Sequence, residues 1–162
     1  MPAISTEGLK INTMKNPFGM RTRKCRKDDY KFVYGLNKKL LFPYVPKYAK
    51  MTKKEFDKNF HKRYKEIIIL ELDDNKIGFY HISNDIYKKN ALYLSSIFIS
   101  PKYQKNGIGY FLMKYFETLG YGKIRLQVWR KNPAFYFYKK LGYKVVSKNK
   151  GKYLMEKILT GI

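Results

Sequence analysis

A loop that contains two closely spaced glycines is the part of the chain best suited to do chemistry. It joins an apolar run to an amphipathic one, and its residues are Ser100, Pro101, Lys102, Tyr103, Gln104, Lys105, Asn106, Gly107, Ile108, Gly109 and Tyr110. Where such a loop opens a helix, the first backbone N–H groups have no intrahelical partner and carry partial positive charge. The glycines let the backbone approach an anion closely, and the lysines add charge. The sequence therefore predicts a phosphate site here.

Two common phosphate-binding motifs do not fit this loop. The dinucleotide fingerprint needs a third glycine, and Leu112 stands at that position. A Walker loop needs Gly-Lys-Ser/Thr, which does not follow the glycines. A Gly-x-Gly alone would also suit ordinary packing between a loop and a helix. The surrounding sequence is therefore needed to distinguish a phosphate site from simple packing.

Local patterns predict the elements that place this loop. A capping box at Thr52 and Glu55 indicates a helix start, Gly142 indicates a helix end, and Pro101 ends an apolar run. We expect strands at 20–25, 66–72, 76–83, 91–99, 124–129, 143–146 and 152–158, and helices at 28–41, 52–64, 107–119 and 133–141. This order predicts an α/β fold in which helices flank a mixed sheet. We expect a flexible tail at 1–19 and a single domain at 20–162.

Two sequence blocks in this order resemble the GNAT superfamily of acyl-CoA-dependent N-acetyltransferases. The first is the glycine loop with the apolar strand before it. The second is Ala-Phe-Tyr-Phe-Tyr-Lys-Lys-Leu-Gly-Tyr at 134–143, preceded by Asn132. The resemblance covers the chain from about Met20 to its end. It implies a mostly antiparallel central sheet with one splayed strand pair and about four flanking helices, acetyl-CoA as co-substrate, and no metal.

The resemblance also assigns roles to individual residues. Loop amides would hold the pyrophosphate of acetyl-CoA, and the end of the central strand would pair with the pantetheine arm. Tyr138 resembles the tyrosine that protonates the leaving thiolate in many members, although its ring could instead simply pack in the core. Asn132 matches a cofactor-facing position, but its spacing to Tyr138 is one residue shorter than usual. The expected cofactor-binding residues are Ile97, Phe98, Ile99, Gln104, Lys105, Asn106, Gly107, Ile108, Gly109, Tyr110, Asn132 and Tyr138.

The chain lacks the general base that many members of this family carry. The usual glutamate positions hold Tyr93 and Gln127, and neither side chain can act as a carboxylate. Three explanations stay open: a base elsewhere, with Glu71, Asp85 and His81 as candidates, an acceptor amine that is neutral without help, or a loss of activity. We name His81 as a catalytic candidate because its unperturbed pKa lies near neutrality. The alternative is a buried strand histidine held by a neighbour.

Composition limits the class of protein. The 162 residues are 44% hydrophobic and 17% aromatic, which suits one ordinary domain and excludes a disordered chain. The single cysteine, Cys25, excludes an intrachain disulfide and a cysteine-based zinc cage. It also fits a reducing compartment. No apolar stretch is long enough to span a membrane, and the first 20 residues have no apolar signal region. We expect a cytoplasmic protein that is a monomer or a homodimer.

The net charge of +23 has two explanations. Lysine outnumbers arginine 29 to 6, a bias that an AT-rich genome produces without selection for binding. Alternatively, the charge serves an anionic partner. Its placement is more informative: residues 38–65, which line the acceptor side in the resembled family, hold 10 basic residues against Glu55 and Asp57. Such a surface disfavours polycationic acceptors.

Three functions stay open. We predict an enzyme that moves an acetyl group directly from acetyl-CoA to a primary amine of a protein or small molecule, with Tyr138 as general acid. In the first alternative the acceptor amine is carried by RNA, as in toxin-type members that acetylate aminoacyl-tRNA. Interleaved tyrosines and lysines in residues 44–64 suit that partner. In the second alternative the protein keeps the fold, lacks catalysis and binds nucleic acid.

Overall fold

The structure, a computed structural model, describes residues 16–159 of the chain. The first 15 positions of the expected tail at 1–19 therefore lie outside the described residues. Phe18, which is described, packs edge-on against Phe111. Within residues 16–159, no helix has the length and apolar character needed to cross a membrane.

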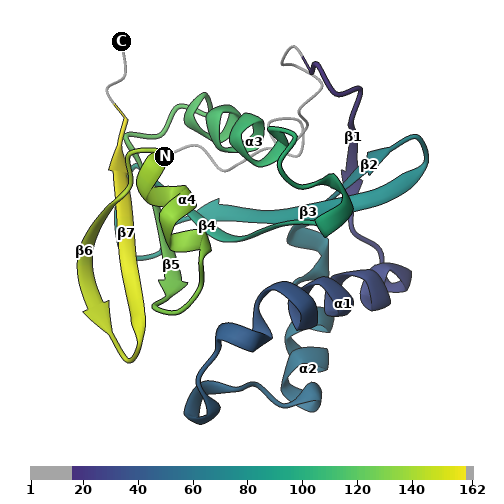
Figure 1. Ribbon diagram of the computed structural model, residues 1–162, viewed down its shortest axis with the longest axis horizontal. Coiled ribbons are helices and arrows are strands. Elements are labelled where there is room, and N and C mark those ends of the chain that lie inside the picture. The colour runs from purple at the N-terminus through teal and green to yellow at the C-terminus, as the bar shows by residue number, and fades with distance from the viewer. Residues whose placement is uncertain (1–15, 160–162) are drawn as a thin grey trace.

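Within the described residues, seven strands form one sheet in the order β1-β2-β3-β4-β5-β7-β6 (Figure 1). Neighbouring strands are antiparallel except for β4 and β5, which run parallel. The strands are β1 (Arg21–Lys24), β2 (Ile67–Leu72), β3 (Asn75–Asn84), β4 (Ala91–Ile99), β5 (Lys123–Trp129), β6 (Lys144–Asn149) and β7 (Lys152–Ile158). The helices are α1 (Tyr30–Leu40), α2 (Lys53–Arg63), α3 (Ile108–Glu117) and α4 (Ala134–Lys140).

Short 3-10 turns connect several of these elements. They are η2 (Lys27–Asp29), η3 (Phe42–Tyr44), η4 (Lys47–Ala49), η5 (Tyr64–Glu66) and η6 (Pro101–Tyr103). The sequence analysis did not predict them, because it assigned these stretches to loops or helix ends. Two of them, η3 and η4, form the connection between α1 and α2.

The predicted fold class is confirmed, and each predicted strand and helix is present. The capping box at the start of α2 is formed: Thr52 Oγ1 accepts from the Glu55 amide at 3.1 Å, and the Glu55 carboxylate accepts from the Thr52 amide at 2.9 Å. Gly142, with φ of +98°, follows the end of α4 as expected. Local signals therefore set most boundaries to within a few residues.

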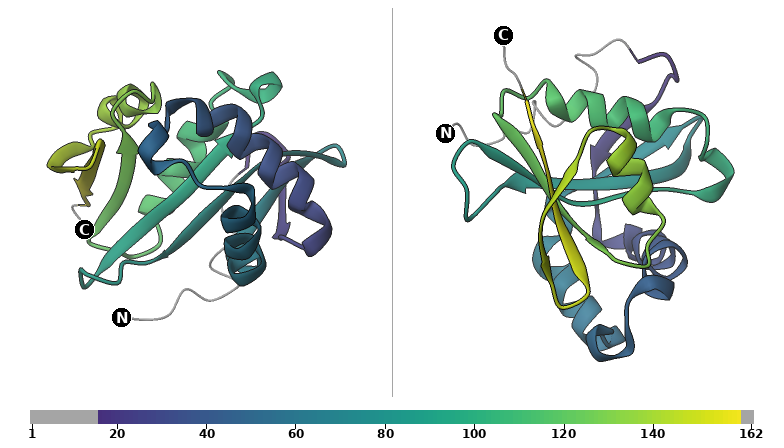
Figure 2. Two further views of the ribbon diagram at one scale, coloured as in Figure 1. Left: turned by 90° about the horizontal axis from the view of Figure 1, so that it is seen from below. Right: turned by 60° about the vertical axis from the view of Figure 1, so that its left-hand side comes forward.

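Helices cover both faces of a strongly twisted sheet, and each face has its own core (Figures 1 and 2). Helices α3 and α4 pack on one face, where Leu112 and Phe116 are completely buried. Helices α1 and α2 pack on the other face with Val33 and Phe60. Side chains alternate along the strands, so neighbouring residues of one strand enter different cores. The sheet is thereby held from both sides.

We expect Phe116→Ala to lower the free energy of unfolding by about 3–5 kcal/mol, because it empties a buried site between α3 and the sheet. The Phe116 ring is completely buried and lies edge-on to Tyr80, with 5.0 Å between ring centroids. Urea unfolding measures the change. Tyr136→Ala is the control, because Tyr136 on α4 is 65% exposed and its loss should cost under about 0.5 kcal/mol. A loss below about 1 kcal/mol for Phe116→Ala would contradict the packing of α3.

Candidate active site

Strands β4 and β5 pair over only part of their length. Their parallel register joins residues 91–94 to residues 123–126 and ends at Leu94 and Leu126. Beyond that point the two strands diverge (Figure 1). The expected splayed strand pair is therefore present.

A β-bulge in β4 explains where the divergence begins. Leu94 pairs with Ile82 of β3 and Ser96 pairs with His81, so Ser95 is an extra residue with no partner on β3. A bulge bends its strand and increases the local twist. This one follows directly after the last β4–β5 pair. The bend therefore turns β4 away from β5 while β4 keeps its pairing with β3.

The divergence leaves one edge of β4 without a neighbouring strand. Ile97, Phe98 and Ile99 pair with β3 on one side, and no described strand pairs with their other side. Backbone N–H and C=O groups must find partners, and an extended ligand can supply them as an added strand would. These three predicted residues thus lie on an edge that suits such a ligand.

The glycine loop continues directly from this edge. The Ser100 amide donates to the Ile77 carbonyl at 2.8 Å, and Gln104 Nε2 donates to the Ile99 carbonyl at 2.8 Å. Gly107 has φ of +89°, a left-handed conformation that favours glycine, and α3 begins at the next residue. The first turn of α3 carries no acidic residue. The loop therefore presents a helix N-terminus that suits an anion, and Gln104 holds it to the end of the strand.

Tyr138 lies on α4 in the same apolar cluster as Ile97, Ile99 and Ile108. The side chain is 9% exposed, and burial raises the pKa of its hydroxyl above the ordinary value. Within the part of the chain that the structure describes, this hydroxyl makes no hydrogen bond. It is thus a protonated, nearly buried donor that is available to a ligand.

Asn132 is placed at the start of α4 rather than free in the site. Its Oδ1 accepts a hydrogen bond from the Ala134 amide at 3.0 Å. An asparagine in this arrangement satisfies one of the amides that a helix start leaves without a partner. The side-chain NH2 group and the second lone pair of Oδ1 stay available for the predicted contact of Asn132 with a cofactor.

His81 lies on β3 beside the bulge, where it pairs with Ser96. Only 8% of the residue is exposed, and its Nε2 is 3.3 Å from Glu66 Oε1. Burial lowers the pKa of His81, and the opposing effect of Glu66 is smaller. The imidazole is therefore neutral at pH 7 and can accept a proton. Its carboxylate partner follows α2, so His81 faces the α1–α2 side of the sheet, opposite Tyr138.

The other candidate bases are held in ion pairs. Glu71 Oε2 lies 3.1 Å from Arg23 Nε, and both Asp85 carboxylate oxygens lie 3.3 Å from Arg125 Nη1. The structure places a further carboxylate beside the same arginine: Glu156 of β7, whose Oε2 lies 2.8 Å from Arg125 Nε. Sequence reasoning missed Glu156 because its position depends on the pairing of β5 with β7. The buried guanidinium thus neutralises carboxylates at the closed end of the splayed pair.

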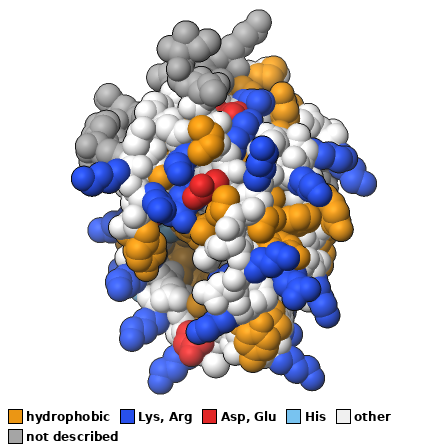
Figure 3. All heavy atoms as spheres, turned by 90° about the vertical axis from the view of Figure 1, so that its left-hand side faces the viewer, with side chains coloured by type: hydrophobic (Ala, Val, Ile, Leu, Met, Phe, Trp, Pro, Cys, Tyr) orange, Lys and Arg blue, Asp and Glu red, His pale blue; other side chains and the backbone are white. Residues whose placement is uncertain are grey.

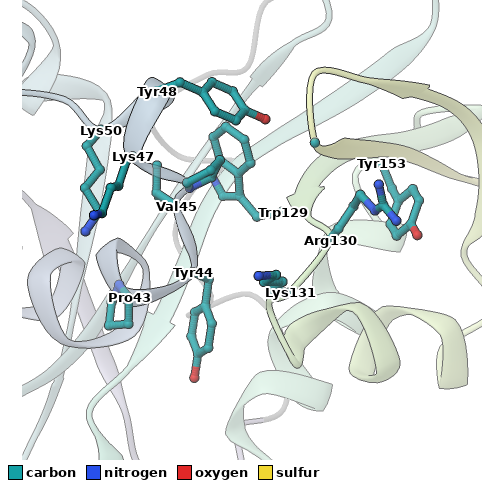
Figure 4. A pocket seen from close by; sticks show the side chains of 12 residues that line it. Pro43, Tyr44, Val45, Lys47, Tyr48, Lys50, Trp129, Arg130, Lys131 and Tyr153 are labelled. Carbon is teal, nitrogen blue, oxygen red and sulfur yellow. The ribbon is translucent and has the colours of Figure 1, made fainter.

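A cavity of about 600 Å³ lies on the side of the α1–α2 connection (Figure 4). Three segments far apart in the sequence enclose it: η3 and η4, the end of β5, and the turn between β6 and β7. Its lining residues are Pro43, Tyr44, Val45, Pro46, Lys47, Tyr48, Lys50, Trp129, Arg130, Lys131, Gly151 and Tyr153. The first wall lies within residues 38–65, which the family resemblance placed on the acceptor side, whereas the walls from β5 and from the β6–β7 turn were not predicted.

Positive charge dominates the cavity and its surroundings. Its lining includes Lys47, Lys50, Arg130 and Lys131 and no aspartate or glutamate. Figure 3 shows a face on which blue Lys and Arg side chains far outnumber red acidic ones. Lys152 Nζ also lies over the Trp129 ring, 4.6 Å from its centroid, and burial lowers the pKa of this lysine. The cavity therefore favours anionic groups.

Comparison with protein families places this fold and site in a class. Residues 63–145 match the family model described as the acetyltransferase (GNAT) domain. This match covers half of the chain, from the end of α2 to β6. The protein belongs to the GNAT acetyltransferase family. No curated protein matches the chain in sequence.

Solved structures of the same fold agree with this membership. The PaiA N-acetyltransferase from Thermoplasma acidophilum, in complex with coenzyme A, has a TM-score of 0.61 at 22% identity, and the match covers 86% of this chain and 98% of that one. Ard1 from Thermoplasma volcanium has a TM-score of 0.64 at 18% identity, and the match covers 88% of this chain and 99% of that one. The spermidine N-acetyltransferase from Vibrio cholerae, in complex with CoA and spermine, has a TM-score of 0.61 at 18% identity. That match covers 88% of this chain and 96% of the other. At these identities the likeness shows the fold alone.

We expect His81 to make the protein less stable in mild acid. The unfolded chain binds a proton near pH 6.5, whereas the buried imidazole in the folded state binds it only at lower pH. Stability therefore falls as pH drops below about 6.5, by at most about 1.4 kcal/mol per pH unit for one proton. Urea unfolding between pH 5 and 7.5 should show a flatter dependence for His81→Gln.

The matched control is His61→Gln, because His61 on α2 is exposed and its replacement removes a histidine without changing the core. Its pH dependence should follow that of the unchanged protein. If His81→Gln also followed the unchanged protein, the buried, neutral state of His81 would be disproved.

Proposed function

We propose that this protein transfers an acetyl group from acetyl-CoA to a primary amine by direct attack. The observation that carries the proposal is the continuity of β4: its free edge leads, without interruption, into the glycine loop and the N-terminus of α3. One segment thus offers strand-like pairing to an extended arm and, at its end, amides to a phosphate. Family membership supports acetyl transfer as the chemistry.

The residues present fit acetyl-CoA. The pyrophosphate would meet the amides at Gly107, Ile108 and Gly109, where no acidic side chain opposes it. The pantetheine arm would pair with the edge of β4 at residues 97–99. The thioester would then lie where β4 and β5 diverge, next to the bulge at Ser95.

The reaction needs one proton removed and one supplied. As the amine nitrogen bonds to the thioester carbon, the carbon–sulfur bond breaks, the amine loses a proton, and the departing thiolate must be stabilised. Tyr138 supplies the donor, since its raised pKa keeps the hydroxyl protonated throughout the neutral range. His81 supplies the acceptor, since its lowered pKa keeps the imidazole neutral. The two lie on opposite sides of the sheet, because Tyr138 belongs to the core under α3 and α4 and His81 pairs with Ile67 of the other core.

The acceptor enters, in this proposal, through the cavity on the α1–α2 side. The Vibrio cholerae neighbour is a spermidine acetyltransferase, but the cations that line this cavity would repel such a polyamine. An amine carried by RNA is the second candidate, because aromatic rings and cations alternate in the lining.

We expect Gly109→Glu to reduce the affinity for acetyl-CoA at least tenfold, because it places a negative charge in the first turn of α3 against the phosphates. The position has space: the nearest atom to an added Cβ is the tip of the Phe137 ring at 3.4 Å. Isothermal titration calorimetry measures the affinity. Gly35→Glu makes the same change in exposed α1, where an added Cβ meets nothing within 4 Å, and should bind normally. Normal binding by Gly109→Glu would overturn the phosphate site.

We expect Tyr138→Phe to lower kcat about 100-fold and to change acetyl-CoA affinity less than twofold, because it removes only the proton donor. Tyr143→Phe is the control, since the Tyr143 ring packs 5.9 Å from Tyr138 between centroids and its buried hydroxyl has no described partner. Steady-state release of CoA measures both variants. Equal rates for Tyr138→Phe and the unchanged protein would remove Tyr138 as the acid. Binding of acetyl-CoA without turnover on any amine would favour the non-catalytic alternative.

A further inference from the structure

The cavity at the end of β5 has the size of a small-molecule site. Its volume of about 600 Å³ falls in the range of sites for small ligands. Tyr48 of η4 reaches across to the β6–β7 turn, where its hydroxyl donates to the Lys150 carbonyl at 2.8 Å. The two walls therefore touch at this point, while the space between them stays open to solvent elsewhere.

The contact between the walls is close because Gly151 has no side chain. A Cβ at Gly151 would lie 2.5 Å from the Tyr48 hydroxyl and 3.6 Å from the Trp129 ring. The backbone there has φ of +85°, which also favours glycine. We call this contact between Tyr48, Lys150 and Gly151 the clasp.

The charge of the lining selects the ligand. Four cationic side chains and no carboxylate line the space, and Lys131 lies between Tyr44 and Trp129 in the view of Figure 4. A second ammonium group on the ligand would be repelled, whereas an anionic group would pair with these cations. The rings of Tyr44 and Trp129 add apolar surface for the rest of the ligand.

We infer that the cavity receives a small amine acceptor that also carries an anionic group, either a phosphate or a carboxylate. This inference rests on the proposed acetyl transfer and names the acceptor class for that same site. The cations of the lining hold the anionic group, the aromatic walls hold the body of the molecule, and the amine reaches the splayed ends of β4 and β5.

The experiment compares pairs of small amines in which one member carries an anionic group and the other does not. CoA release from acetyl-CoA is measured at constant ionic strength with ethanolamine against phosphoethanolamine, and with propylamine against β-alanine. Putrescine serves as the dicationic amine, and an oligonucleotide with a terminal aminoalkyl group serves as the polymer. We expect kcat/KM at least tenfold higher for the anionic member of one or both pairs. The phosphate and carboxylate pairs show which anion the site prefers.

Reversing one charge in the cavity is the second part of the experiment. Lys131→Glu should reduce the preference for the anionic member at least tenfold and leave the KM for acetyl-CoA within twofold. Lys88→Glu is the matched control: it makes the same change in net charge on the exposed β3–β4 loop, at the other end of β4 from the glycine loop. The control should keep the preference of the unchanged protein.

The outcomes separate the inference from the function on which it rests. Equal rates for neutral and anionic amines would overturn the inference while acetyl transfer stands. A higher rate with the oligonucleotide than with any small amine would overturn it in favour of a nucleic-acid acceptor. If Lys131→Glu raised the KM for acetyl-CoA as much as it lowered the preference, the cations would serve the cofactor instead. If acetyl-CoA bound but no amine were acetylated, both the proposed acetyl transfer and this inference would be overturned.

Discussion

The site depends on one irregularity in the sheet, the bulge at Ser95. A strand cannot pair along both edges and also offer an edge to a ligand. Here β4 pairs with β3 on both sides of the bulge, and the bulge releases it from β5 after Leu94. Cores on both faces hold the released segment in place: Ile97 and Ile99 pack toward α3 and Phe98 toward α1. The glycine loop follows directly from the same segment, so the position of the loop and of the proposed phosphate site depends on that of the free edge.

The distribution of acids explains why the cavity is so positive. Only 12 acidic residues accompany 35 basic ones, and several acids are held within the fold. Asp29, with a side chain 1% exposed, binds both Arg23 and Lys76, and Asp85 and Glu156 flank Arg125. Leaving any one of these charges buried without its partner would be costly. These acids neutralise the interior and are thus kept away from the cavity, whose cations stay uncompensated.

Local sequence signals predicted most of the fold and the position of the glycine loop within it. The glycine loop, the capping box at Thr52 and the strand at 91–99 are set by nearby residues, so patterns along the chain suffice. The bulge could not be predicted from Ser95 and Ser96 alone, because it is a property of the register with β3; only the family resemblance implied a splay. The same holds for Glu156 and Trp129, which enter the site through the pairing of β5 with β7. Residues that gather by tertiary pairing leave no mark in sequence spacing.

The clasp has a consequence for the order of folding. Its hydrogen bond joins Tyr48 to Lys150, which are 102 positions apart. Contacts of such long sequence separation form late, because the chain between them must be ordered first. The glycine loop, by contrast, needs only β3, β4 and α3, which are neighbours along the chain. We therefore expect a chain emerging during synthesis to form the glycine loop before the contact that joins the two walls of its cavity.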